Sequence, residues 1–183
     1  MDNLEKIYLG GGCFWCVEAV FQNLKGVKSV VSGFMDGHLV NPTYRDVCTG
    51  FSGHNEVVEI SFDPNIITLK NLLYVFFTSH DPTTLNRQGN DIGTQYRSGI
   101  YATSDDQKEM SKSFIQNEAA EIWDNNIVTE VKSASKFYPA EDYHQDYFNN
   151  NQEQGYCRII IEPKVNKVKE KFKHLLNDER EKV

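Results

Sequence analysis

Two cysteines separated by two residues form the most reactive feature of the sequence. Cys13 and Cys16 follow three consecutive glycines. The apolar segment 7–9 predicts a strand that runs into this glycine turn, and apolar side chains at helical spacing over 17–24 predict a helix after it. Cys13 is therefore expected at or near a helix N-terminus, where the helix dipole and free N–H groups lower the pKa of a thiol. A thiolate in that place is a candidate nucleophile.

The same pair of cysteines allows other interpretations. The aromatic residues between them could be core residues beside an inert Cys13. Cys13 and Cys16 could instead be a dithiol pair that exchanges disulfides with proteins. They could also form half of the zinc site of a binding module, with Cys48 and Cys157 as the remaining ligands.

Three further groups have side chains suited to acid–base chemistry or substrate contact. Glu56 opens a predicted strand, and burial beside an apolar pocket would raise its pKa and make it a candidate acid. A turn presents the phenol of Tyr44. The stretch 80–97 has no periodicity and is rich in Asp, Asn, Gln, Gly and Thr, which is typical of a functional loop. It would present Asp91 and the phenol of Tyr96.

Predicted strands alternate with predicted helices along the chain. Further strands are predicted over 27–34, 56–62, 99–103, 127–131 and 156–161. Helices are predicted over 69–77, from Ser104 towards Trp123 with a capping box between Ser104 and Gln107, and over about 163–182 as a charged, solvated C-terminal helix. The pattern predicts an α+β, two-layer sandwich in which helices flank a central mixed sheet. We expect one domain over residues 1–183.

Composition narrows the class of protein. The chain has 183 residues, a formal net charge of −7 and four cysteines. An acidic chain disfavours general nucleic-acid binding, and no apolar run approaches the length of a membrane span. Four cysteines are too few for a disulfide scaffold, and no signal peptide is recognised, so we expect a cytoplasmic protein with reduced thiols. We expect no membrane partner.

Seven short motifs in this order resemble the A-type peptide methionine sulfoxide reductases, over about residues 7–157. The motifs are Gly12-Cys13-Phe14-Trp15, Asn41-Pro42-Thr43-Tyr44, Gly53-His54 with Glu56, His80-Asp81-Pro82-Thr83, Asn86-Arg87-Gln88-Gly89 with Asp91, Gly93-Thr94-Gln95-Tyr96-Arg97-Ser98, and Ala140-Glu141-Asp142-Tyr143-His144-Gln145. The resemblance implies a ferredoxin-like core and reduction of methionine S-sulfoxide, in proteins or free, by a monomer without metal or organic cofactor.

The resemblance also implies a role for each of these residues. Cys13 would attack the sulfoxide sulfur and become a sulfenic acid, while Glu56 protonates the sulfoxide oxygen with help from the hydroxyls of Tyr44 and Tyr96. The substrate methyl group would lie against Phe14 and Trp15, and Asp91 would orient the substrate backbone. A second thiol would then form a disulfide with Cys13, which thioredoxin reduces.

The second thiol is the point at which the sequence departs from the family. Cys16 stands where many members have glycine, and the C-terminal region holds Cys157 where many members have two cysteines. Cys16 lies one helical turn from Cys13, where a disulfide would require the first turn to loosen. We therefore favour Cys157, carried by a flexible tail, and keep Cys16 as the alternative. Cys48 is expected to be a spectator.

Overall fold

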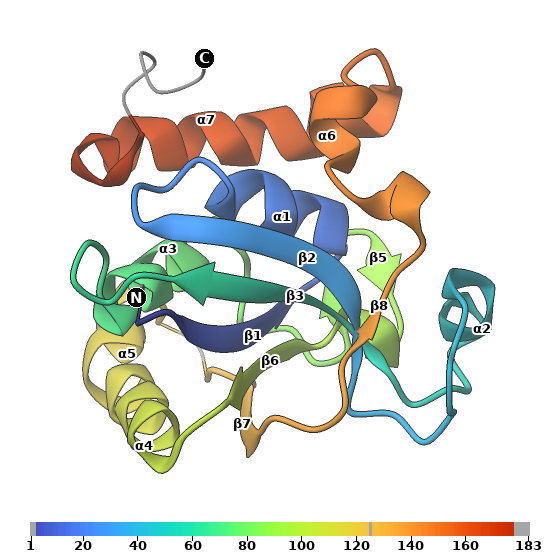
Figure 1. The fold of residues 1–183 in the computed structure, drawn as a ribbon, viewed down its shortest axis with the longest axis horizontal. Coiled ribbons are helices and arrows are strands. Elements are labelled where there is room, and N and C mark those ends of the chain that lie inside the picture. The colour runs from blue at the N-terminus through green and yellow to red at the C-terminus, as the bar shows by residue number, and fades with distance from the viewer. Residues whose placement is uncertain (1–2, 125, 178–183) are drawn as a thin grey trace.

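A six-stranded mixed β-sheet forms the centre of the computed structural model, which describes residues 3–124 and 126–177. Neighbouring strands are antiparallel except for the parallel pair β6 and β7. A separate hairpin consists of β4 (Arg87–Gln88) and β5 (Asp91–Ile92). Across the main sheet the order is β7 (Glu130–Ser133), β6 (Ser98–Ala102), β1 (Glu5–Gly11), β3 (Asn55–Phe62), β2 (Val27–Met35) and β8 (Tyr138–Pro139) (Figure 1).

The connections between the four inner strands give a ferredoxin-like core. Helix α1 (Phe14–Phe21) connects β1 to β2, and α3 (Leu69–Ser79) connects β3 to β6. The strand order β6-β1-β3-β2 with antiparallel neighbours is that of a split β-α-β pair. The predicted α+β architecture with a mixed sheet flanked by helices is confirmed.

The helices form layers on the sheet. Helices α1 and α3 pack against each other, and α7 (Glu162–Lys171) lies across both (Figure 1). Helix α4 (Asp105–Phe114) continues through the wider turn Ile115–Ala119 into α5 (Ala120–Ile122). The short helices are α2 (Tyr44–Cys48) and α6 (Tyr147–Asn150), and single 3₁₀ turns cover Thr94–Tyr96, Asp142–His144 and Lys173–Leu175.

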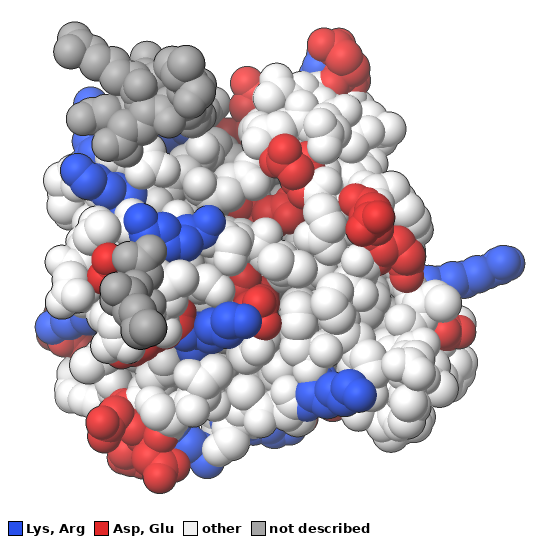
Figure 2. Space-filling model, in the orientation of Figure 1, with Lys and Arg blue, Asp and Glu red and all other residues white. Residues whose placement is uncertain are grey.

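The surface carries charges of both signs. On the face drawn in Figure 2, lysine and arginine side chains are scattered among acidic ones rather than gathered in one patch. Within the described ranges, 3–124 and 126–177, no helix has both the length and the apolar character needed to cross a bilayer.

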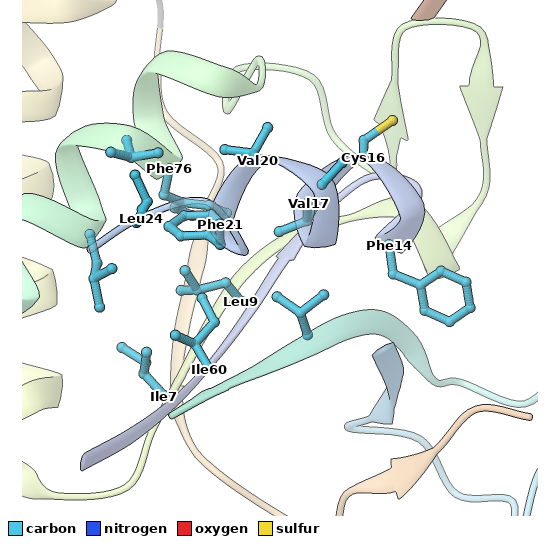
Figure 3. Close-up of a cluster of buried hydrophobic side chains, with 14 of the residues drawn as sticks. Ile7, Leu9, Phe14, Cys16, Val17, Val20, Phe21, Leu24, Ile60 and Phe76 are labelled. Atoms are coloured by element: carbon cyan, nitrogen blue, oxygen red, sulfur yellow. The ribbon is translucent and has the colours of Figure 1, made fainter. Parts of the chain in front are cut away.

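The core beneath α1 fixes the orientation of that helix. Val17 and Phe21 are nearly or fully buried on the side of α1 that faces Leu9 and Ile60, whereas buried Val20 points to the other side, as Cys16 does (Figure 3). Figure 3 also shows that the sulfur of Cys16 points away from the sheet. The apolar spacing predicted from the sequence therefore determines which way the start of α1 presents its cysteines.

Side-chain caps fix the starts of several helices. The Thr68 hydroxyl accepts the N–H of Asn71 at the start of α3. The Ser104 hydroxyl accepts the N–H of Gln107, as predicted, but the Gln107 side chain accepts the N–H of Thr103 instead of that of Ser104. The predicted box at α4 is therefore only half formed.

One predicted strand is wrong. Residues 156–161 are helical and continue from the wider turn Cys157–Ile161 into α7. The run is apolar and rich in isoleucine, which favours a strand. Cys157 and Ile161 are nevertheless buried together with Val165 and Val168, so the apolar stripe follows a helical period through Pro163.

Two further boundaries differ from prediction. The strand expected over 127–131 begins only at Glu130, because the N–H of Val128 donates to the carbonyl of Pro82 instead of to β6. The C-terminal helix expected over about 163–182 ends at Lys171 and is followed by a 3₁₀ turn. Residues 178–182 of that predicted helix lie outside the described part of the chain.

Candidate active site

Cys13 is the residue that links β1 to α1. β1 ends at Gly11, and Gly12 turns the chain with φ +93°. A Cβ on Gly12 would lie 2.6 Å from Cγ of Gln88, so the turn needs glycine for both its backbone angle and its space. Cys13 is the N-cap of α1, and its carbonyl accepts the N–H of Cys16. The predicted placement at a helix N-terminus is confirmed.

The pKa of Cys13 differs from the sequence-based expectation. Burial raises the pKa of this thiol well above its usual range, with further contributions from the neighbouring thiol of Cys16 and from the carboxyl of Glu56. The backbone N–H of Trp15 lowers the pKa, as expected at a helix start, but the effect is smaller. Only 9% of Cys13 is exposed, so loss of hydration outweighs the helix N-terminus.

Glu56 supplies a buried carboxyl next to this helix start. It lies on β3 with 1% of its surface exposed, and its Oε1 accepts the N–H of Phe14 at 3.2 Å. Burial raises its pKa from 4.5 to about 8, although the Phe14 N–H opposes the shift. Among the described residues, Oε2 has no hydrogen-bond partner. The carboxyl is therefore protonated at neutral pH, with one oxygen free to bind a polar atom of a ligand.

Both predicted phenols lie within electrostatic reach of Glu56. Tyr44 is the first residue of α2, and Tyr96 ends the 3₁₀ turn in the long loop. Burial raises the pKa of each phenol, and the carboxyl of Glu56 raises both further. Both hydroxyls therefore keep their protons at neutral pH and can donate hydrogen bonds.

An aromatic wall extends from the helix start. The Phe14 ring packs against Tyr44 with centroids 6.1 Å apart, and Trp15 stacks on Tyr147 at 3.7 Å and 7°. Trp15, Tyr44 and Tyr147 line a hollow of about 490 Å³. Phe14 itself is fully buried and does not line the hollow, whereas Trp15 is partly exposed there.

His144 and Glu141 fix the side chains of this wall through hydrogen bonds, and neither residue was assigned a role from the sequence. The Trp15 indole N–H donates to Nδ1 of His144 at 3.0 Å, so Nε2 of His144 carries the proton and lies 3.3 Å from Glu141 Oε2. Glu141 Oε1 accepts the backbone N–H of Tyr44 at 2.9 Å. Their presence in one of the seven motifs was the signal that could have identified them.

Asp91 lies on the other side of Cys13, where the C-terminal region reaches the site. Its Oδ2 accepts the Tyr156 hydroxyl at 2.8 Å, and that hydroxyl also lies 3.8 Å from the sulfur of Cys16. A groove of about 620 Å³ opens here between the β4–β5 hairpin and the C-terminal helix. Its lining includes both Cys13 and Cys16.

The remaining cysteines lie in three different settings. Cys16 is the third residue of α1 and is buried. Cys157 is fully buried within the C-terminal helix, where a flexible tail was expected. Cys48 is exposed at the end of α2, within hydrogen-bonding reach of the Tyr44 hydroxyl. No set of three or more metal-binding side chains in residues 3–124 and 126–177 is placed to hold a metal ion, so the four cysteines do not form the zinc site considered above.

The relation between Cys13 and Cys16 removes the geometric objection to a disulfide between them. Cys13 precedes the helix with extended backbone angles, φ −57° and ψ 125°. Its thiol makes no cap hydrogen bond to the backbone of α1, and Cys16 is the third residue of that helix. Each thiol shifts the pKa of the other, and both line the same groove. The first turn of α1 therefore need not loosen for the two sulfur atoms to meet.

Comparison with known proteins places the chain in a family. The sequence model described as Peptide methionine sulfoxide reductase matches residues 5–176. The protein is 56% identical to "Peptide methionine sulfoxide reductase MsrA" of Chromobacterium violaceum over 176 residues, which is 96% of this chain and all of that protein.

Solved structures agree with this match. Reduced Mxr1 from Saccharomyces cerevisiae has a TM-score of 0.78 and 35% identity, covering 84% of this chain and 89% of that one. Mxr1 in complex with Trx2 has a TM-score of 0.54 and 26% identity, covering 79% and 84%. The breadth of the family match and the identity to its members establish that this chain belongs to the peptide methionine sulfoxide reductase family.

Proposed function

We propose that this protein reduces methionine S-sulfoxide, free or within proteins, to methionine. The observation that carries the proposal is the carboxyl of Glu56, which is protonated at neutral pH, buried beside Cys13 and left with one unpartnered oxygen. A sulfoxide oxygen leaves sulfur only after it has been protonated, and this group supplies the proton in a site that excludes water.

The first step joins Cys13 to the substrate. The Cys13 sulfur attacks the sulfoxide sulfur and gives up its proton, the substrate S–O bond breaks as an S–O bond forms at Cys13, and methionine leaves. The sulfoxide is reduced, and Cys13 is oxidised to a sulfenic acid, so no external oxidant or reductant enters this step. Glu56 donates its proton to the sulfoxide oxygen and is reprotonated by the proton that leaves Cys13, while Tyr44 and Tyr96, whose raised pKa values keep them as hydrogen-bond donors, stabilise the negative charge on the oxygen before it is protonated.

The wall formed by Phe14 and Trp15 suits the methyl group of the substrate. When the oxygen is bound at Glu56 and the methyl group lies against the wall, only one of the two epimers turns the accessible face of its sulfur atom toward Cys13. We propose that this is the S epimer. Asp91 faces the groove on the other side and would orient the substrate backbone once the Tyr156 hydroxyl yields its place.

Cys16 is the better placed of the two candidate resolving thiols. It lines the same groove as Cys13, three residues along the chain, whereas Cys157 does not line this groove and is fully buried within a helix. We therefore propose that Cys16 displaces the oxygen of the Cys13 sulfenic acid as water, forming a disulfide. Thioredoxin would then reduce that disulfide by thiol exchange, an assignment supported by the yeast relative in complex with Trx2.

We also propose the remaining properties expected from the sequence. Residues 1–183 would form one domain and act as a monomer in the cytoplasm, where thiols stay reduced. The proposed reaction needs neither a metal nor an organic cofactor. The acidic net charge disfavours nucleic acid as a partner.

Turnover of a methionine sulfoxide peptide tests the function. We expect the parent protein, with dithiothreitol as reductant, to reduce the S epimer and leave the R epimer unchanged. Cys13→Ser should abolish turnover, whereas Cys48→Ser, at an exposed thiol, is the matched cysteine control. Failure of folded protein to reduce either epimer, combined with disulfide exchange on protein substrates, would refute the proposal in favour of a dithiol oxidoreductase.

A further inference from the structure

The C-terminal helix brings a cation to Cys16. Cys16 borders both the 620 Å³ groove and a small void beneath it, and Lys164 borders both spaces as well. Lys164 is the one lysine or arginine among the described residues that line either space. It also forms no ion pair with a carboxylate within residues 3–124 and 126–177, so its charge is not neutralised by a neighbour in that part of the chain.

The helix that carries Lys164 is held against the site by two kinds of contact. Tyr156, Ile160 and Lys164 are spaced by four residues and face the groove together. The next residue in each case, Cys157, Ile161 and Val165, is buried on an adjacent side of the helix and packs it into the core. The Tyr156 hydroxyl anchors its start to Asp91. Lys164 is therefore placed by the fold and not by a mobile tail.

We propose that Lys164 is a positioning residue for the resolving step, whose ammonium stabilises Cys16 as a thiolate. The inference rests on the proposed function and names the group that prepares its second thiol. In this step the Cys16 thiolate attacks the sulfur of the Cys13 sulfenic acid. The S–S bond forms, the S–O bond breaks, and the departing oxygen takes up a proton to leave as water, so that Cys13 is reduced and Cys16 is oxidised.

The same charge acts again when the disulfide is reduced. An external thiolate attacks Cys13, the S–S bond breaks, and its electron pair departs with Cys16. A thiol with a lower pKa leaves faster, so a nearby cation speeds this exchange. The second thiolate of the reductant then attacks the mixed disulfide and releases Cys13.

Several titratable groups besides Lys164 face Cys16. The neighbouring Cys13 thiol lowers the pKa of Cys16 the most, burial opposes this, and Lys164 and Tyr156 lower it further, whereas Asp91 raises it. His80 borders the small void, but burial lowers its pKa to about 4, so it is neutral in the relevant range. Lys164 is therefore the one permanent positive charge among these groups.

The test measures the stability of the Cys13–Cys16 disulfide against glutathione between pH 5 and pH 9. A cation that stabilises the Cys16 thiolate favours the reduced form only at a pH where Cys16 is ionised. If Lys164→Met removes about one pKa unit of stabilisation, the equilibrium should shift about tenfold toward the disulfide at high pH, which lowers its reduction potential by about 30 mV. At low pH the equilibrium should not change. A purely structural effect would be the same at every pH.

Three variants make this test specific. Lys164→Arg keeps the charge and should restore the parent profile, and Lys164→Gln replaces Lys164→Met if that protein does not fold. Lys169→Met removes an exposed lysine from the same helix and should match the parent at every pH. Dimedone should also trap about threefold more Cys13 sulfenic acid in Lys164→Met at pH 7, because tenfold less thiolate is partly offset by its higher nucleophilicity.

Failure of the inference and failure of the proposed function give different results. Parallel pH profiles for the parent and Lys164→Met, in protein that reduces the sulfoxide, would overturn the role of Lys164 alone. The expected profiles in protein that reduces no sulfoxide would uphold the effect of Lys164 on Cys16 and refute the proposed function.

Discussion

Replacement of Glu56 by glutamine should make the protein resist alkaline pH. The buried carboxyl binds its proton more tightly in the folded chain than in the unfolded one, because burial raises its pKa from 4.5 to about 8. Its contribution to folding is therefore fully present below pH 4.5 and is lost as the pH rises to about 8. Glutamine cannot ionise and should show no such loss.

The expected size of the effect follows from the two pKa values. The difference between 4.5 and about 8 corresponds, at 1.36 kcal/mol for each pH unit, to about 5 kcal/mol of unfolding free energy. The stability of Glu56→Gln relative to the parent should therefore rise by about 1.4 kcal/mol for each pH unit across this window and level off above pH 8. The Phe14 N–H still finds an oxygen acceptor in glutamine, so that hydrogen bond is retained.

Urea unfolding of the two proteins at a series of pH values from 5 to 9 measures the effect. Glu59→Gln is the control, because Glu59 lies on the same strand but bonds to exposed Lys6 and to the Tyr8 hydroxyl. Sulfoxide turnover by Glu56→Gln should fall by about 10²–10⁴ as the acid is lost. Parallel stability curves for Glu56→Gln and the parent would refute the assignment of a buried, protonated carboxyl.

Three further predictions concern the surroundings of Cys13. Cys16→Ser should still form one methionine but no disulfide, whereas Cys157→Ser should form both. Counting free thiols after one turnover measures this difference, and the reverse pattern would make Cys157 the resolving thiol. Gly89→Ala should lower the free energy of unfolding by about 1–2 kcal/mol, because alanine is strained at a positive φ. Gly12→Ala should lower it clearly more, because there the new Cβ also meets Gln88, whose amide is bound to Asp81. Equal losses in urea unfolding would contradict the steric argument. His144→Ala leaves the Trp15 N–H without its acceptor, so it should cost about 1–3 kcal/mol and raise KM more than it lowers kcat; an unchanged KM would show that the wall does not depend on His144.

The sequence predicted those features that depend on local pattern. The glycines before Cys13 and the helical spacing after it place this thiol at a helix start, and the apolar run from Ile7 predicts β1. The four inner strands and the helix at 69–77 follow in the same way. Such features need only the period of the apolar residues and the backbone freedom of glycine.

The features that the sequence missed depend on tertiary contacts. The run 156–161 has the composition of a strand, but it is helical because its buried face packs on α1 and because it continues into α7, which packs on α1 and α3. The pKa of Cys13 was expected to fall at a helix N-terminus, but burial raises it, and no local pattern reports how deeply a thiol is buried. The hydrogen bond from Trp15 to His144 spans 129 residues and is likewise invisible to any local pattern.

A single turnover without reductant tests the central claim most directly. Reduced protein is mixed with an excess of the methionine S-sulfoxide peptide, and methionine and free thiols are counted. We expect one methionine for each chain, loss of two thiols, and a disulfide that peptide mapping assigns to Cys13 and Cys16. No methionine, or methionine formed with every thiol intact, would contradict this claim.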